Sequence, residues 1–173
     1  NHAGPINKNW TSLKKEGFFP SILCPTNWKI QAKAKIIRDI AHKSIPTGIK
    51  ALRELSKKTN AFAVEFSTTV EDFTTKNLSN YDGLIFNNTT RVEKAFVTDE
   101  QRDSLLNFIK SGKGFSGFHG ASDAGMPKWP AYTEMIGGCF DGHPWNAGGT
   151  WPFTVEDPDH SLCKNFSSTT FQF

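Results

Sequence analysis

Hydrophobic and polar positions follow two different spacings along this chain, one typical of helices and one typical of strands. Between residues 45 and 58, apolar side chains recur every three or four positions, which predicts an amphipathic helix with Ser44 as its N-cap and Pro46 in its first turn. The capping-box pair Thr98 and Gln101 predicts a second helix that ends near Gly112. A third, short helix is predicted over 129–136.

Short runs rich in β-forming residues separate these helices. They cover 61–66, 82–87, 114–118 and 151–156, with a weaker, partly alternating strand within 29–41. Strands that alternate with helices are typical of βαβ units, so the pattern predicts an α/β domain with an open, mostly parallel sheet. Residues 1–28 show no sustained period and several prolines, so we interpret them as an N-terminal arm or extension beside a domain over 29–173.

Composition narrows the function classes. The chain has 173 residues, which fits one domain, and its 15 Phe and 5 Trp predict a core filled with rigid aromatic rings. The net charge of +3 is too small to indicate a nucleic-acid partner. Residues 1–60 hold most of the basic side chains, which favours a solvated basic surface, with an arm that grips an acidic partner as the alternative. No apolar run reaches the length of a membrane span.

The compartment stays open between cytoplasmic and secreted. The three cysteines lack metal-ligand spacing, and their odd number argues against a complete disulfide framework. The N-terminal residues show no apolar stretch typical of a signal peptide. N-glycosylation motifs would suit a secreted glycoprotein, although N-x-S/T also arises by chance; they begin at Asn9, Asn77, Asn87, Asn88 and Asn165.

Polar residues follow three of the predicted strands and should meet at one edge of a parallel sheet. His42 follows the first strand, Asn88 the strand at 82–87, and His119 the strand at 114–118. Gly117 to Ala121 has the small-x-functional-x-small form of a nucleophile elbow, with His119 where an acyl-transfer enzyme has Ser or Cys. His119 is therefore a candidate general acid or base or a candidate metal ligand, with a purely structural loop histidine as the alternative.

Further candidates lie near this segment and downstream. Asp123, Asp141 and His143 could add carboxylate and imidazole groups, which would suit a divalent metal if they converge in space. No cofactor is indicated with certainty. Trp129 and Tyr132 could stack on sugar rings or simply fill the core.

These segments together resemble the trehalose-utilisation (ThuA-like) family within the class I glutamine-amidotransferase-like fold. The match runs over roughly residues 36–160, and its main pieces are 42–49, 80–90, 112–123 and 140–144. The resemblance implies a flavodoxin-like sandwich with helices on both faces of the sheet, and a link to trehalose and keto-disaccharide metabolism. By position, it implies a pocket formed by His42, His119, Asp123 and His143. The family usually continues beyond Phe173, so we expect the domain to be incomplete at its C-terminus.

Two functions follow from these observations. The first is an enzyme, for example a hydrolase or isomerase acting on a small carbohydrate and not a Cys-dependent amidotransferase, with His119, His143 and Asp123 as catalytic residues. Substrate contacts are then predicted for His42, Asn88, Trp129 and Tyr132. The alternative is a non-catalytic carbohydrate-binding or assembly module with the same fold, which would form a homo-oligomer or a larger assembly.

Overall fold

The computed structural model describes residues 42–123, 129–138, 140–143, 148–166 and 168–172. The chain divides into two compact units, one ending at Phe140 and one beginning at Asp141. The predicted arm over 1–28 and the predicted strand within 29–41 lie outside the described residues, so the boundary between arm and domain stays a prediction.

A parallel strand pair forms the centre of the first unit. Strand β1 (Gly83–Asn87) pairs with β2 (Gly114–Phe118) in a register that runs from Gly83 opposite Gly114 to Asn87 opposite Phe118. The connection between them contains the helices α3 (Val92–Ala95) and α4 (Asp99–Lys110). Both strand predictions and the parallel pairing are thus confirmed. The larger open sheet stays a prediction, because the described sheet of this unit has two strands.

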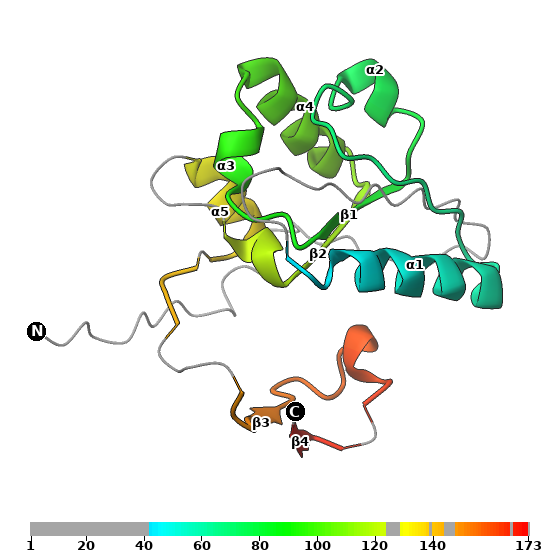
Figure 1. The fold of residues 1–173 in the computed structure, drawn as a ribbon, viewed down its shortest axis with the longest axis vertical. Coiled ribbons are helices and arrows are strands. Elements are labelled where there is room, and N and C mark those ends of the chain that lie inside the picture. The colour runs from blue at the N-terminus through cyan, green and yellow to red at the C-terminus, as the bar shows by residue number, and fades with distance from the viewer. Residues whose placement is uncertain (1–41, 124–128, 139, 144–147, 167, 173) are drawn as a thin grey trace, which may run out of the picture. The chain divides into compact units, whose positions relative to one another are not determined.

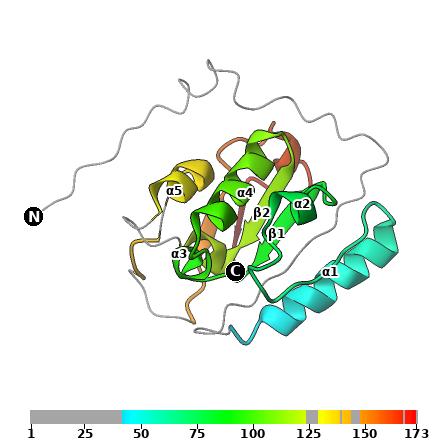
Figure 2. The ribbon, with the colours of Figure 1, turned by 90° about the horizontal axis from the view of Figure 1, so that it is seen from above.

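Helices lie on both sides of this strand pair (Figures 1 and 2). Helix α1 (Ile45–Thr59) lies on one side, and α2 (Thr75–Leu78) and α4 lie on the other. The predicted capping box of α4 is complete, since the Thr98 side chain accepts from the Gln101 N–H and the Gln101 side chain accepts from the Thr98 N–H. Helix α5 (Pro130–Ile136) matches the short helix predicted over 129–136.

The start of α1 differs from the prediction in one respect. Ser44 occupies the N-cap position and Pro46 lies in the first turn, as predicted. The Ser44 backbone is already helical (φ −78°, ψ −12°), and its side chain makes no capping hydrogen bond. An N-cap side chain reaches the following N–H groups from an extended backbone, so the predicted side-chain cap was wrong.

The core packs aromatic rings on the strand pair, as the composition predicted. Phe86 of β1 lies at its centre and is fully buried. Its ring contacts Phe73 and Phe96 at centroid distances of 6.1 and 6.0 Å. Tyr132 of α5 and Trp129, the residue before α5, complete the cluster.

The strand predicted at 61–66 stays a prediction, because the strand predicted within 29–41 lies outside the described residues and pairing between the two is not tested. The side chains of 61–66 alternate between exposed and half-buried, as in a strand, and they form no ladder with the rest of the described chain. The run of β-forming residues that predicts this strand fits the alternation of exposed and half-buried side chains. A strand also needs a hydrogen-bonded neighbour, and the spacing of apolar residues contains no information on that neighbour.

The second unit contains β3 (Pro152–Thr154), the 3-10 helix η3 (Ser161–Cys163) and β4 (Thr170–Gln172). Strand β3 confirms part of the strand predicted over 151–156, but it pairs antiparallel with β4 and not within a parallel sheet. The Phe171 ring stacks on Phe153 and Phe166 at centroid distances of 5.7 and 5.1 Å. Cys163 is a free thiol.

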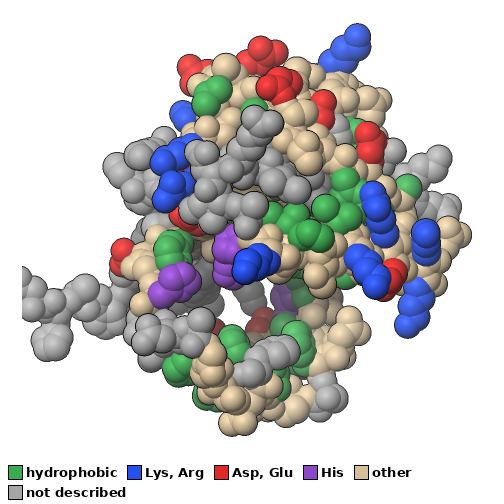
Figure 3. All heavy atoms as spheres, in the orientation of Figure 1, with side chains coloured by type: hydrophobic (Ala, Val, Ile, Leu, Met, Phe, Trp, Pro, Cys, Tyr) green, Lys and Arg blue, Asp and Glu red, His purple; other side chains and the backbone are tan. Residues whose placement is uncertain are grey.

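Charges are separated over the surface of the first unit (Figure 3). Lys and Arg side chains project along α1, whereas Asp and Glu side chains gather over α4. Lys50, Arg53, Lys57 and Lys58 of α1 are all exposed. Among the basic residues of the segment 1–60, those of α1 thus form a solvent-exposed helix face. None of the described helices is long and apolar enough to cross a membrane.

Candidate functional site

Polar residues after β1 form a buried end to that strand. Asn87, Asn88 and Thr89 are all buried, and Asn88 adopts a left-handed backbone with φ 56°. The Asn88 N–H donates to the Phe118 carbonyl at 3.3 Å, which ties the end of β1 to the end of β2. Two of the three predicted strand ends therefore meet at one edge of the sheet, which we call the rim.

Asn87 attaches the first turn of α1 to this rim. Its side-chain Nδ2 donates to the Ile45 carbonyl at 3.1 Å, and its Oδ1 accepts from Asn88 Nδ2 at 3.1 Å. Gly48 of α1 comes so close that a Cβ there would lie 2.5 Å from Asn87 Oδ1. The residues just before α1 are thereby held at the rim, and His42 is one of them.

His42 and His119 lie in contact at the rim. Their ring centroids are 4.6 Å apart and the rings are nearly perpendicular, at 89°. His42 is half-buried, and its Nε2 is buried without a hydrogen-bond partner among the described residues, while His119 is exposed. A buried imidazole nitrogen without a partner is costly, so this atom is a good candidate to bond a ligand.

His119 stands at the tip of a sharp turn, as the elbow pattern predicted. β2 ends at Phe118, His119 has φ 47°, and the 3-10 helix η2 (His119–Ser122) follows at once. A Cβ at Gly117 would lie 2.6 Å from Ala121 Cβ, so this close packing requires a glycine. A non-glycine residue in the left-handed region is uncommon, and such residues often occur at functional sites.

Two side chains hold the backbone of this turn. The Tyr132 hydroxyl donates to the Ala121 carbonyl at 2.9 Å, and Ser122 Oγ donates to the His119 carbonyl at 3.0 Å. Burial raises the pKa of the Tyr132 hydroxyl well above its usual range, so it remains protonated and able to donate. Asp123 ends the turn, and its carbonyl accepts from the Val92 N–H of α3 at 3.3 Å.

The other predicted site residues lie elsewhere. Trp129 and Tyr132 are core residues with exposures of 4% and 0%, so in this structure neither offers a ring face to a sugar. Trp129 packs on Phe96 and beneath the Arg102 guanidinium. His143 is exposed and belongs to the second unit, so its predicted convergence with His119 stays a prediction.

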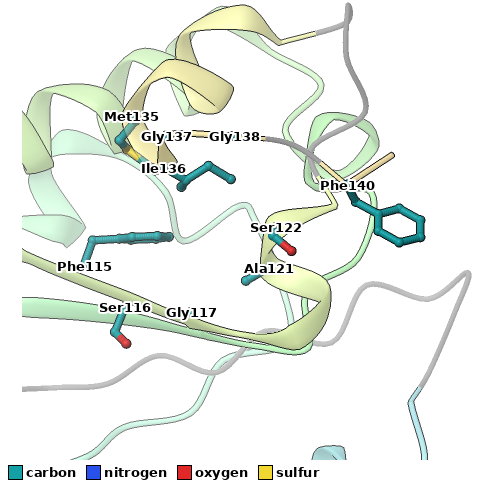
Figure 4. Close-up of a pocket in the computed structure, with 10 residues that line it drawn as sticks. All are labelled: Phe115, Ser116, Gly117, Ala121, Ser122, Met135, Ile136, Gly137, Gly138 and Phe140. Carbon is teal, nitrogen blue, oxygen red and sulfur yellow. The ribbon is translucent and has the colours of Figure 1, made fainter. Parts of the chain in front are cut away.

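A cavity of about 560 Å³ lies between β2 and α5 (Figure 4). Phe115 and Ser116 of β2 line one wall, and Met135 and Ile136 of α5 line another. A third wall contains Gly117, Ala121 and Ser122, which belong to the His119 turn or directly precede it, but neither histidine lines the cavity. It therefore lies next to the imidazole pair and is a separate feature.

Asn87 and Glu93 were not among the predicted site residues. Asn87 directly follows an apolar strand, which is the sequence signal that could have identified it. Glu93 of α3 is 6% exposed, and its Oε2 is buried without a hydrogen-bond partner in the described part of the chain. In sequence Glu93 looks like an ordinary exposed helix carboxylate, so no pattern could have singled it out.

The described residues contain no group of three or more His, Cys, Asp or Glu side chains arranged to hold a metal ion. His42 and His119 would supply two ligands. Divalent metals of the zinc type usually take three or four ligands from the protein, so this pair alone is an incomplete set.

Comparison with known proteins identifies the family. A family model described as ThuA, trehalose utilisation, matches residues 34–173. The chain belongs to the ThuA family. A solved ThuA-like protein from Bacteroides uniformis is similar in fold, with a TM-score of 0.63 and 21% identity. The match covers 86% of this chain and 59% of that one, so this chain spans about three fifths of the length of its ThuA-like neighbour. No curated protein matches the chain.

Proposed function

We propose that the rim of this ThuA-family chain binds a small carbohydrate of the trehalose or keto-disaccharide type, and that His42 and His119 contact its reacting group. The contact between the two imidazoles is the main support for this proposal. Family membership supports the substrate class, since the family is described by trehalose utilisation.

The arrangement suits acid–base chemistry on a sugar. Imidazole can donate or accept a proton near neutral pH, and two rings in contact can serve the two ends of one proton transfer. His42 Nε2, buried and without a partner, would bond a sugar hydroxyl or carbonyl oxygen. His119 would reach the same group from the exposed side, and Asn88 would bond a neighbouring hydroxyl. Asp123 and His143 remain proposed contributors from the turn and from the second unit.

Two finer proposals accompany this one. The strand pair would be part of a larger open, flavodoxin-like sheet, and the parallel pairing of β1 with β2 supports this proposal. A divalent metal would be held by the two rim histidines together with a further ligand such as His143 or Asp123, and it would polarise a sugar carbonyl.

The test is binding of trehalose and its 3-keto derivative, measured by calorimetry on wild type, His119→Asn and His42→Gln. We choose asparagine at 119 because His119 has φ 47°, a conformation that asparagine tolerates better than most residues. Lys113→Met is the matched control. Lys113 precedes β2 and bonds the Tyr81 carbonyl at the opposite end of the strand pair from His119.

We expect Kd to rise at least about tenfold in both histidine variants, as for loss of a hydrogen bond to a buried or charged group, and to stay unchanged in Lys113→Met. Equal affinity in all four proteins would contradict the proposal. Conversion of either sugar would be monitored by NMR over hours. If a sugar binds but is not converted, the result would support the non-catalytic binding module in place of an enzyme.

A further inference from the structure

Tyr132 has an unusual combination of burial and polar contact. Its side chain is fully buried, yet its hydroxyl donates to a backbone carbonyl of the turn that presents His119. The usual sequence interpretation, a tyrosine that stacks on a sugar, does not apply to a ring with no exposed surface. The hydroxyl requires another explanation.

The ring of Tyr132 is fixed against both strands of the pair. It stacks on Phe86 of β1 at a centroid distance of 6.3 Å and an angle of 15°. It meets Phe115 of β2 edge-on at 6.2 Å and 90°, and it also contacts Trp129. Because these contacts leave the ring little freedom, the hydroxyl oxygen has a fixed position relative to the sheet.

The turn that the Tyr132 hydroxyl contacts has a strained backbone, which other contacts must stabilise. His119 holds a left-handed backbone that costs of the order of 1 kcal/mol or more for a non-glycine residue, and such a conformation persists only when its surroundings impose it. The Ser122 side chain bonds within the turn itself and cannot tie it to the core. Ala121, in the middle of η2, is the residue whose carbonyl accepts the bond from Tyr132.

We propose that Tyr132 is a positioning residue for His119: its buried hydroxyl holds the η2 backbone so that the imidazole stays against His42. The positioning of the imidazole is independent of the function proposed above. Only the expected effect of Tyr132 on ligand binding rests on that proposed function. Ser122 Oγ closes the turn locally, while Tyr132 joins it to the aromatic core. Tyr132 touches no ligand in this proposal.

The test uses Tyr132→Phe in the full chain, which removes the hydroxyl and keeps the ring. The readout is the Cε1–H resonance of His119 and its titration midpoint, without sugar, assigned by its loss in His119→Asn. We expect the resonance to shift or broaden in Tyr132→Phe and to be unchanged in Lys113→Met, which disturbs the opposite end of the strand pair. A His119 signal in Tyr132→Phe that overlays the wild-type signal at every pH would overturn the proposal.

Sugar binding separates this inference from the proposed function. If a sugar binds wild type, Kd should rise about fivefold in Tyr132→Phe, as for the loss of one ordinary hydrogen bond. If no sugar binds but the His119 resonance moves, the proposed function fails and the positioning role stands. If Tyr132→Phe does not fold, 3-fluorotyrosine in place of both tyrosines makes the hydroxyl a stronger donor. In a Tyr81→Phe background, only Tyr132 carries the fluorine label, and the label should then shift the His119 resonance. No shift would overturn the inference.

Discussion

Strands β1 and β2 lie side by side in register, yet their exposure differs along nearly the whole length. In β1, every residue except Ile85 is buried, including Phe86, which is fully buried. In β2 no residue is buried, and the last three, Ser116 to Phe118, are exposed. Both strands have apolar residues in a short run, so the sequence alone does not distinguish them. Both are edge strands of the described two-stranded sheet, so the difference lies in what covers them: α1 contacts β1, and Leu84 and Phe86 of β1 belong to the buried core cluster.

This difference divides the rim into two functional parts. The polar residues after β1 are buried and bonded to the protein, since Asn87 holds the Ile45 carbonyl and the Asn88 side chain. The residue after β2 is an exposed imidazole on a strained turn. The comparison teaches that the β1 end fixes the geometry of the rim, while the β2 end presents an imidazole to solvent, where we propose that a ligand binds.

The largest expected effect tests the difference in burial between a phenylalanine of β1 and one of β2. Phe86→Ala should destabilise the chain by about 3–5 kcal/mol, because it removes a fully buried aromatic ring from the core. The matched change in β2, Phe118→Ala, should cost about 1 kcal/mol or less, because that ring is 43% exposed. Urea unfolding followed by fluorescence measures both. Equal losses would mean that β2 is buried to the same degree as β1 in solution.

A smaller effect tests the attachment of α1 to the β1 end. In Gly48→Ala, the new methyl group would meet the Asn87 amide at 2.5 Å. Overpacking of this kind costs about 1–3 kcal/mol, against a gain of up to about 1 kcal/mol from the better helix propensity of alanine. We therefore expect a net loss of stability by urea unfolding and a shift of the His42 resonance. Gly138→Ala, with nothing within 4 Å of the new Cβ, is the control. A Gly48→Ala protein more stable than wild type would show that the Asn87 contact is not tight.

The sequence predicted the elements of the first unit well where a local signal defines them. The helix from Thr98 was recognised from two residues that cap each other, and the turn at His119 from small residues at fixed spacing. These signals are local because the bonds that they reflect form within a few residues. The family resemblance is confirmed by the match over residues 34–173.

The parts that could not be predicted depend on contacts between distant residues. The segment at 61–66 forms no ladder with the other described residues, and Tyr132 looks like a sugar-stacking residue although its ring is buried against Phe86 of β1 and Phe115 of β2. The contact of His42 with His119 joins residues far apart in the chain, and it depends on the parallel pairing and on the Asn87 bond to α1, which are themselves contacts between distant residues. A single sequence does not show which residues distant in the chain come into contact.

The last and smallest effect concerns Tyr132, the residue that joins the His119 turn to the aromatic core. An unfolded tyrosine has a pKa of about 10, and burial raises the pKa of Tyr132 above this value in the folded chain. Above pH 10 the unfolded chain therefore loses a proton that the folded chain keeps, so the stability from Tyr132 is complete below pH 10 and falls as the pH rises. Tyr132→Phe has no such proton to lose.

The free energy of unfolding of wild type and Tyr132→Phe, measured by urea unfolding at intervals from pH 9 to pH 11, tests this directly. Wild type should be the more stable at pH 9 by about 1 kcal/mol, the value of one buried hydrogen bond. The gap should then narrow by about 1 kcal/mol toward pH 11, since a one-proton difference changes stability by about 1.4 kcal/mol per pH unit. Every lysine and arginine is common to both proteins, so their titration cancels in the difference. Two curves that stay parallel would mean that the Tyr132 hydroxyl ionises as easily in the folded chain as in the unfolded one, and the buried link between the core and the His119 turn would then be wrong.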